Sequence, residues 1–370
     1  MPWKLHGTQR SINKAKSLFM YDVILSFITS FSLTYLAIPS IIGVAKAKHI
    51  YDVPGDSTRR SHDTPVPRLG GLAIFAGVVL SVTLWTPFQV FAGLQYILCA
   101  LVVIFLIGFR DDIQPISPLY KMIGQLFAAA ILVFKANIRL TSLYGIIGIY
   151  DIPFIPSVLL SIFTIIVIIN AFNLIDGING LSGSITVLIT LTLGTWFLLI
   201  DRMEIAVLAF SLAAAVVAFL NYNFTPAQVF MGDTGSLLIG SVCSILTIKF
   251  IELHKELVNS EYSFKAVPAV AVGILILPLY DTLRVFTMRI LRGRSPMSPD
   301  RNHIHHLMID AGLNHMQTTG ILVAVNLLFI FMVLFLQGIG TLNLLLLILS
   351  IATLLSGLLF MIARRRRLAQ

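Results

Sequence analysis

The sequence predicts an all-α polytopic integral membrane protein of about eleven transmembrane helices, with its active-site loops on the cytoplasmic face. Two observations lead to this prediction. Of the 370 residues, 57% are hydrophobic and only 12% are charged, about half the charged fraction of an average soluble domain. The apolar residues come in repeated runs, and a helix needs about 20 such residues to cross a bilayer. The composition excludes a disordered chain and an ordinary water-soluble core.

Hydropathy and helix breakers place the predicted spans along the chain. We expect an N-terminal tail over residues 1–20, a single transmembrane domain over 21–363 and a basic tail over 364–370. The first apolar run is too long for a secretory signal peptide, and no clear small-residue cleavage site follows it. The predicted spans are 21–45, 70–88, 92–109, 118–135, 156–172, 183–200, 205–221, 235–251, 267–285, 318–336 and 342–363.

Basic residues indicate the orientation of the chain. An odd number of spans puts the termini on opposite sides, and cytoplasmic loops are enriched in Lys and Arg. Sixteen of the 26 basic residues, including Arg364–Arg367, lie on the side of the C-terminus, against ten on the other. The sequence therefore predicts a cytoplasmic C-terminus. The net charge of +9 is assigned to the membrane surface, and we expect no nucleic-acid partner.

Most acidic and histidine side chains gather in loops on the predicted cytoplasmic side. Asp111 and Asp112 end the third span, where adjacent carboxylates repel each other and are costly to desolvate. They indicate a divalent cation, a nearby base or a proton to be moved, and two solvated loop acids are the alternative. Lys121 is a candidate phosphate ligand or, alternatively, a snorkelling lysine at a helix start.

A second polar motif covers residues 170–183. Asn170, Asn173 and Asp176 recur every three residues, which places them on one face of a helix. The glycines that follow allow the backbone to approach a ligand closely. A polar stripe at the end of a membrane helix is expensive unless it is used, so we interpret it as part of a site. A capped helix end with a flexible turn is the alternative.

A third motif, residues 221–236, ends with an acid before a long apolar span. Asp233 follows Gly232 directly, and a helix N-cap with no further role is the alternative for an acid at that position. Phe230 is either a core ring or a platform for a planar base. The run Met231–Ser236 is more particular than a cap requires, so we include it in the predicted site.

Two basic loops complete the pattern. In the loop over 292–306, three histidines follow Arg301, and His303 and His306 can share a helical face. No Cys, His or Glu set with the spacing of a structural zinc site accompanies them, so we interpret the loop as anion-binding. A positive-inside loop would explain the arginines but not the histidines. Arg68 lies in an earlier Pro- and Gly-rich loop, for which anchoring on anionic lipid is the alternative.

In this order the motifs FRDD, NAFNLIDGINGLSG, FMGDTGS and HIHH resemble those of the polyprenyl-phosphate N-acetylhexosamine-1-phosphate transferase superfamily. The resemblance implies transfer of HexNAc-1-phosphate from a UDP-HexNAc to undecaprenyl or another polyprenyl phosphate, with release of UMP. It also implies Mg²⁺ as cofactor, with Mn²⁺ as a substitute. The expected location is the bacterial inner membrane, at the first membrane step of a cell-envelope polysaccharide such as O-antigen or a teichoic-acid linkage unit.

The HIHH form resembles the branch that transfers GlcNAc-1-phosphate, because the peptidoglycan translocase has a different histidine-rich loop. The resemblance leaves open which HexNAc is used and whether two copies form a homodimer. Phospho-MurNAc-pentapeptide transferase activity is the alternative within the superfamily. An ion-coupled transporter with Asp176, Asp233 and Asp281 as intramembrane sites is the alternative from another class, although transporters usually bind near the midplane.

The resemblance implies roles for individual residues. Asp233 is the expected metal ligand, and Asp111 and Asp112 either complete the metal environment or position and deprotonate the lipid phosphate, which Lys121 binds. Direct attack and a covalent intermediate both fit these residues. The other expected site residues are Asn170, Asn173 and Asp176 at the reaction centre, Asn179, Asn223 and Phe230 around uridine, and Arg68, Arg301, His303, His305 and His306 on the donor's pyrophosphate or sugar.

One position departs from the superfamily pattern. The second motif usually reads Asp-Gly-x-Asp-Gly, whereas here Asn179 replaces the second acid. An amide can replace a carboxylate that hydrogen-bonds uracil more readily than one that ligates a metal. We therefore assign position 179 to nucleotide binding.

Overall fold

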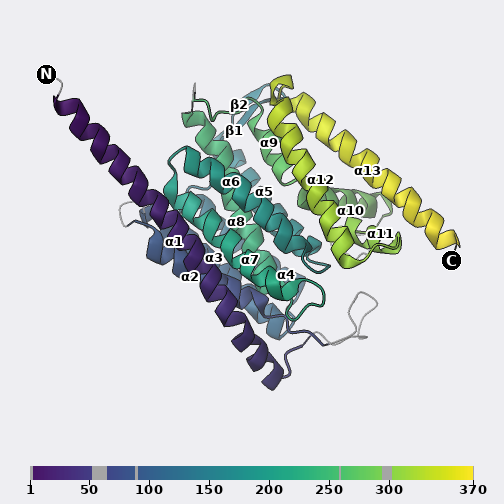
Figure 1. The fold of residues 1–370 in the computed structure, drawn as a ribbon. Helices are drawn as coiled ribbons and strands as arrows, with labels where there is room; N and C mark the ends of the chain where they lie inside the picture. The colour runs from purple at the N-terminus through teal and green to yellow at the C-terminus, as the bar shows by residue number, and fades with distance from the viewer. Residues whose placement is uncertain (1–2, 52–64, 88–90, 258–259, 294–301, 370) are drawn as a thin grey trace.

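The computed structural model describes residues 3–51, 65–87, 91–257, 260–293 and 302–369, which form a bundle of helices with one short hairpin (Figure 1). The predicted all-α fold class is confirmed. The helices are α1 (Trp3–Ala47), α2 (Gly70–Trp85), α3 (Phe91–Ile113), α4 (Pro118–Phe134), α5 (Phe154–Ile175), α6 (Leu181–Leu199), α7 (Met203–Asn223), α8 (Gly232–Leu253), α9 (Val267–Ile274), α10 (Ile276–Leu291), α11 (Ile304–Asp310), α12 (His315–Leu336) and α13 (Thr341–Ala369).

Every predicted span coincides with a helix or a broken helix pair, but eleven membrane crossings are not confirmed. Within the described part of the chain, eight helices are long and apolar enough to cross a membrane, or nine if α9 and α10 form one broken span. Helices α2 and α4 are apolar but have only 16 and 17 residues. Both are shorter than the roughly 20 residues that a perpendicular crossing needs.

The predicted span 267–285 is bent by 84° between α9 and α10. Pro278 lies four residues after Ile274, and a proline ring clashes with the carbonyl at that distance and offers no N–H. Asn326 on α12 satisfies backbone groups at the break. Its side chain donates to the Ile274 carbonyl (3.1 Å) and accepts from the Leu277 N–H (3.2 Å). A break inside a membrane is tolerated where such partners exist.

Helices α7 and α8 form the centre of the molecule and are buried along most of their length, whereas α1 and α13 are largely exposed at the periphery. Helix α8 packs against α3 and α5, and α7 packs against α1 and α6. Helices α9 to α13 form a second group, joined to the first through α5 and α6. Helix α1 begins at the opposite end of the bundle from the end of α13 (Figure 1).

A two-stranded antiparallel hairpin between α4 and α5, β1 (Ser142–Ile146) with β2 (Ile149–Asp151), was not predicted from the sequence. Ile147 and Gly148 at its turn both have positive φ, as a two-residue hairpin turn of the primed type requires. Ile147 gave no turn signal in the sequence, because a β-branched residue rarely adopts such a backbone.

Candidate active site

Five loop segments that are distant in the sequence meet at one end of the bundle. We name this region the motif end, and it comprises residues 65–70, 111–117, 176–180, 224–233 and 302–306. Gly70 N donates to the Phe230 carbonyl (2.9 Å), and Asn179 Nδ2 donates to Thr225 Oγ1 (3.0 Å). Asp112 contacts Asp233 N at the start of α8, and the His305 ring lies against Gly177, which adds the other two segments. The motif loops predicted to lie on one side therefore meet, as far as their residues are described.

Lys121 on α4 lies between two carboxylates at the motif end. Its ammonium group pairs directly with Asp233 and is 3.6 Å from Asp111 Oδ2. Asn173 on α5 donates to Asp233 Oδ1 (2.6 Å) and to Ser236 Oγ (2.8 Å). Since the Lys121 side chain is only 17% exposed, it is not a lysine that extends to the solvent. The centre of the site consists of Lys121, Asp111, Asp233 and Asn173.

Asp112 has a different environment from its neighbour Asp111. Its Oδ1 accepts the Asp233 N–H (2.7 Å), and its Oδ2 accepts the Thr234 N–H (2.9 Å) and the Thr234 hydroxyl (2.5 Å). Asp112 therefore caps the start of α8 from another helix, where N–H groups lack partners within the helix and a negative charge is favourable. Asp233 lies in the first turn of α8 and is not its cap.

Close backbone packing holds the start of α8 in place. A Cβ on Gly71 would lie 2.1 Å from Gly235 N, and a Cβ on Gly108 would lie 2.5 Å from Thr234 Cα. The backbones of α2 and α3 thus contact the first turn of α8 directly. These contacts bring Asp112 within hydrogen-bonding distance of residues more than a hundred positions away in the sequence.

The predicted polar stripe of α5 divides between different partners. Asn173 contacts Asp233, but Asn170 donates to Gln125 Oε1 (2.7 Å) and to the Ile166 carbonyl (2.8 Å). Asp176 follows the end of α5 and accepts a hydrogen bond from Ser182. Burial, together with the negative charge of Asp233, raises the pKa of Asp176 to about 6, although the Ser182 bond opposes this. Asp176 is therefore able to titrate near neutral pH.

The segments predicted to surround uridine dock onto one another. Asn223 is buried, donates to the Val229 carbonyl (2.9 Å) and accepts the Gly180 N–H (2.7 Å). Gly180 has a φ of 76°, which turns the chain from α5 into α6 and favours glycine. The Asn223 amide is thus engaged within the protein, whereas Asn179 lies closer to the surface, at Thr225. A contact of either residue with uridine stays a prediction.

The histidines do not share one helical face as predicted. His303 precedes α11 in extended backbone (φ −63°, ψ 150°), and its ring stacks on His305 with centroids 5.7 Å apart. The His306 ring is 4.3 Å from that of His305. Burial and the neighbouring His306 lower the pKa of His305 to about 3, so its imidazole is neutral at physiological pH. Arg301 lies outside the described residues.

The segment over residues 67–71 hydrogen-bonds to the chain that directly precedes α8. Phe230 N donates to the Pro67 carbonyl (2.7 Å), and Gly71 N donates to the Met231 carbonyl (2.9 Å). The predicted site residues Arg68 and Phe230 therefore lie side by side at the motif end, and both are partly buried.

The sequence model of glycosyl transferase family 4 matches residues 94–251, which include three of the four motifs. The chain is 31% identical over 264 residues to the undecaprenyl-phosphate alpha-N-acetylglucosaminyl 1-phosphate transferase of Salmonella typhimurium, covering 70% of this chain and 69% of the relative. This chain belongs to glycosyl transferase family 4. The superfamily predicted from the motifs is confirmed.

Two further relatives have names of the same kind. The chain is 30% identical over 309 residues to the decaprenyl-phosphate N-acetylglucosaminephosphotransferase of Mycobacterium leprae, covering 78% of this chain and 77% of the relative. It is 29% identical over 311 residues to a probable undecaprenyl-phosphate N-acetylglucosaminyl 1-phosphate transferase of Bacillus subtilis, covering 84% of each. These alignments extend well beyond the family-model match.

The carboxylates around Lys121 are suited to a magnesium ion whose remaining ligands come from a substrate. Among the described residues, no group of three or more His, Cys, Asp or Glu side chains is arranged to hold a metal ion by itself. Mg²⁺ is usually bound by one or two carboxylates plus substrate phosphates and water. Asp233 and Asp111 both face the ammonium group of Lys121, and two carboxylates around one positive charge are the donor set that such a cation would need. Asp112 uses both oxygens on α8, and its assignment as a metal ligand stays a prediction.

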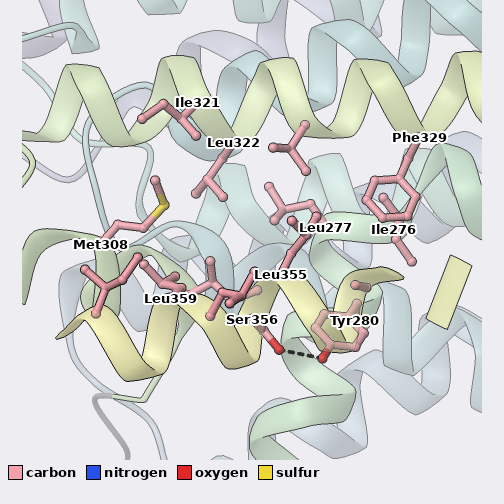
Figure 2. Close-up of a pocket in the computed structure, with 15 residues that line it drawn as sticks. Ile276, Leu277, Tyr280, Met308, Ile321, Leu322, Phe329, Leu355, Ser356 and Leu359 are labelled. Carbon is pink, nitrogen blue, oxygen red and sulfur yellow. Dashed lines mark hydrogen bonds between the residues drawn. The ribbon is translucent and has the colours of Figure 1, made fainter. Parts of the chain in front are cut away.

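An apolar cavity of about 260 Å³ lies between α10, α11, α12 and α13 of this family-4 chain, and none of the site carboxylates lines it (Figure 2). Leu277, Met308, Leu322 and Phe329 contribute to its walls. A hydrogen bond between Tyr280 and Ser356 (2.8 Å) lies at its edge (Figure 2). The cavity is therefore distinct from the polar centre around Lys121.

Some partners of the site residues had no role of their own in the sequence-based prediction. Gln125, Ser182 and Ser236 hydrogen-bond to Asn170, Asp176 and Asn173, respectively. Ser182 and Ser236 lie within the polar motifs 170–183 and 221–236. Gln125 is a single polar residue inside an apolar helix, and nothing in its local pattern distinguishes it. Asp281 has a predicted role only in the transporter alternative. An acid three residues before Arg284 in an apolar helix was the available signal.

Proposed function

We propose that this protein transfers GlcNAc-1-phosphate from UDP-GlcNAc to a polyprenyl phosphate such as undecaprenyl phosphate, with Mg²⁺ as cofactor. The observation that carries the proposal is the group of Lys121, Asp111 and Asp233 at one end of a membrane bundle. Relatives named for the same transfer with GlcNAc and undecaprenyl or decaprenyl phosphate support it. We place the motif end on the cytoplasmic side of the bacterial inner membrane, as the basic residues predict.

In this reaction an oxygen of the lipid phosphate forms a bond to the β-phosphorus of the donor. The bond between that phosphorus and the bridging oxygen breaks, and UMP leaves with the bond electrons. A site at a membrane-facing helix end suits both substrates, because the prenyl chain stays in the bilayer while the nucleotide is soluble. Enzymes catalyse such transfers largely by positioning and by charge stabilisation.

The residues at the centre have separate tasks in this proposal. Lys121 binds the lipid phosphate, which replaces its present carboxylate partners. Asp233 and Asp111 would hold Mg²⁺, and Asn173 keeps the Asp233 carboxylate oriented through its 2.6 Å hydrogen bond. A bound magnesium ion would neutralise charge on the donor's pyrophosphate. Asp176, with its raised pKa, is suited to exchange a proton with a phosphate oxygen.

The nucleotide is assigned to the surface formed by the 176–180 and 224–230 loops. Asn179 is only partly buried there, and Phe230 in the second of these loops supplies an aromatic ring. The histidine loop, which is the 302–306 segment of the motif end, borders the same region, because the His305 ring lies against Gly177. We therefore assign the pyrophosphate and sugar of the donor to the side of His303, His305 and His306.

The transporter alternative has less support. Asp176 and Asp233 lie at the motif end, whereas transporters usually bind their substrates near the midplane. Asp281 is enclosed by partners from its own helix and from the 302–304 segment. Phospho-MurNAc-pentapeptide as the transferred group is tested by the choice of donor.

The test is release of UMP from UDP-GlcNAc by the purified full-length protein in detergent. We expect release to require both polyprenyl phosphate and Mg²⁺. Asp233→Asn should abolish turnover, and Asp151→Asn, an exposed position on β2, serves as the matched control. Turnover of a UDP-MurNAc-pentapeptide in place of UDP-GlcNAc would overturn the donor assignment. No release with any UDP-HexNAc from folded protein would contradict the transferase proposal.

A further inference from the structure

Asp281 on α10 is a buried carboxylate to which the reaction proposed above assigns no task. The residue is 1% exposed and accepts hydrogen bonds from three donors. His303 Nδ1 lies 2.8 Å from its Oδ2, and Oδ1 accepts the Ile304 N–H (2.9 Å) and a guanidinium N–H of Arg284 (3.1 Å). Two of these three donors belong to the histidine loop.

Arg284 strengthens the connection between α10 and the histidine loop. Its guanidinium group pairs with Asp281 one helical turn earlier and also donates to the Asn302 carbonyl. A buried carboxylate is costly unless it is paired and hydrogen-bonded. Here one acid and one arginine from the same helix bind Asn302, His303 and Ile304. The Ile304 N–H is the first of α11, so Asp281 also caps this helix from outside.

The histidine loop in turn contacts the loop that follows α5. The His303 ring stacks on the His305 ring at an interplanar angle of 12°. His305 is 2% exposed, and its Nε2 would lie 2.3 Å from a Cβ placed on Gly177. Gly177 directly follows Asp176, so an uninterrupted series of contacts connects Asp281 to the reaction centre.

We propose that Asp281 is a positioning residue for the donor site, which it serves by orienting His303 and fixing the start of α11 against the Gly177 loop. The Nδ1 position of His303 donates to the carboxylate, so its Nε2 is directed away from Asp281. A carboxylate that fixes the tautomer and orientation of an imidazole is a recurrent arrangement in active sites. The role in donor binding rests on the proposed function, whereas the anchoring of α11 does not.

The test compares Asp281→Asn with Asp151→Asn in the full-length protein. The asparagine retains an acceptor for Ile304 N–H but loses the charge that pairs with Arg284 and His303. We expect faster amide hydrogen exchange across Ile304–Asp310 and a KM for UDP-GlcNAc that rises roughly tenfold, the size of losing one hydrogen bond to a charged group. The KM for polyprenyl phosphate should stay unchanged, and Asp151→Asn should change none of these quantities.

Unchanged exchange in Asp281→Asn would overturn the anchoring, and faster exchange with an unchanged donor KM would overturn the role in donor binding. An unmodified protein that releases no UMP would contradict the proposed function, while the exchange data would still test the anchoring. If Asp281→Asn does not fold, His303→Asn and His303→Ala make the same comparison. Asparagine retains a donor near the Nδ1 position, so equal exchange in these two variants would overturn the proposal.

Discussion

Replacing Asp112 by asparagine separates two roles that the adjacent carboxylates at the end of α3 can have. Asp112 accepts two backbone N–H groups and one hydroxyl from the first turn of α8, at 2.7, 2.9 and 2.5 Å. Asparagine has one acceptor oxygen, so at least one of the two backbone donors loses its partner. The substitution also removes a negative charge from the N-terminal end of a helix.

The expected cost follows from these contacts. A hydrogen bond to a charged group contributes about 1.5–3 kcal/mol, and the favourable charge at a helix N-terminus contributes about 0.3–1 kcal/mol. We therefore expect Asp112→Asn to lower the free energy of unfolding by about 3 kcal/mol. Asp112→Ala leaves all three donors without this acceptor and should cost more.

The assay is denaturant unfolding in detergent with EDTA, so that no metal contributes to stability. Asp111→Asn is the matched control, since the neighbouring Asp111 carboxylate accepts only the Ile116 N–H (2.7 Å) among described backbone groups and lies 3.6 Å from Lys121. We expect a smaller loss of stability in Asp111→Asn than in Asp112→Asn. For turnover, we expect the Mg²⁺ requirement to shift in Asp111→Asn.

One result would refute this reasoning. If Asp112→Asn unfolds like Asp111→Asn in EDTA but needs much more Mg²⁺ for turnover, Asp112 acts as a metal ligand. The hydrogen bonds to α8 would then be weaker than their geometry indicates. The sequence-based prediction of Asp112 as a ligand would be favoured instead.

Three further predictions concern the surrounding loops. Because the pKa of Asp176 is raised from 3.8 to about 6, the folded protein binds this proton more tightly than the unfolded chain, and stability falls as the pH rises from about 4 to about 6. Asp176→Asn should remove this slope and gain up to about 3 kcal/mol at pH 7; an unchanged pH profile of unfolding would contradict this. Gly232→Ala should lower the free energy of unfolding by at least about 2 kcal/mol, since φ is 72° and a Cβ would lie 2.2 Å from the Arg68 carbonyl. The control Gly43→Ala has open space around it and should not destabilise the protein. Asn179→Asp should retain UMP release, because the Thr225 hydroxyl can donate instead of accept; complete loss would refute the assignment of this position to uridine.

The sequence alone determined the fold class, the approximate helix positions and the meeting of the motif loops at one end of the bundle. Apolar runs separated by polar loops are local patterns, and in a membrane they leave few alternatives to helices. The convergence of the motif loops follows from this alternation, since successive helices return the chain to the same end. The family could also be predicted, because four short motifs in a fixed order are a specific signal.

Only the tertiary structure decided which partner each polar side chain has. Asp111 and Asp112 are adjacent in the sequence, yet one lies near Lys121 and the other caps α8, a helix that begins about 120 positions later. The distance between α3 and α8 sets this difference, and it depends on Gly71 and Gly108 having no side chain. His303 likewise hydrogen-bonds to Asp281 and does not share a helical face with His306. The reason is that Pro278 breaks the predicted span, and α10 then lies beside the histidine loop. Such contacts depend on the packing of distant helices, which periodicity along the chain does not encode.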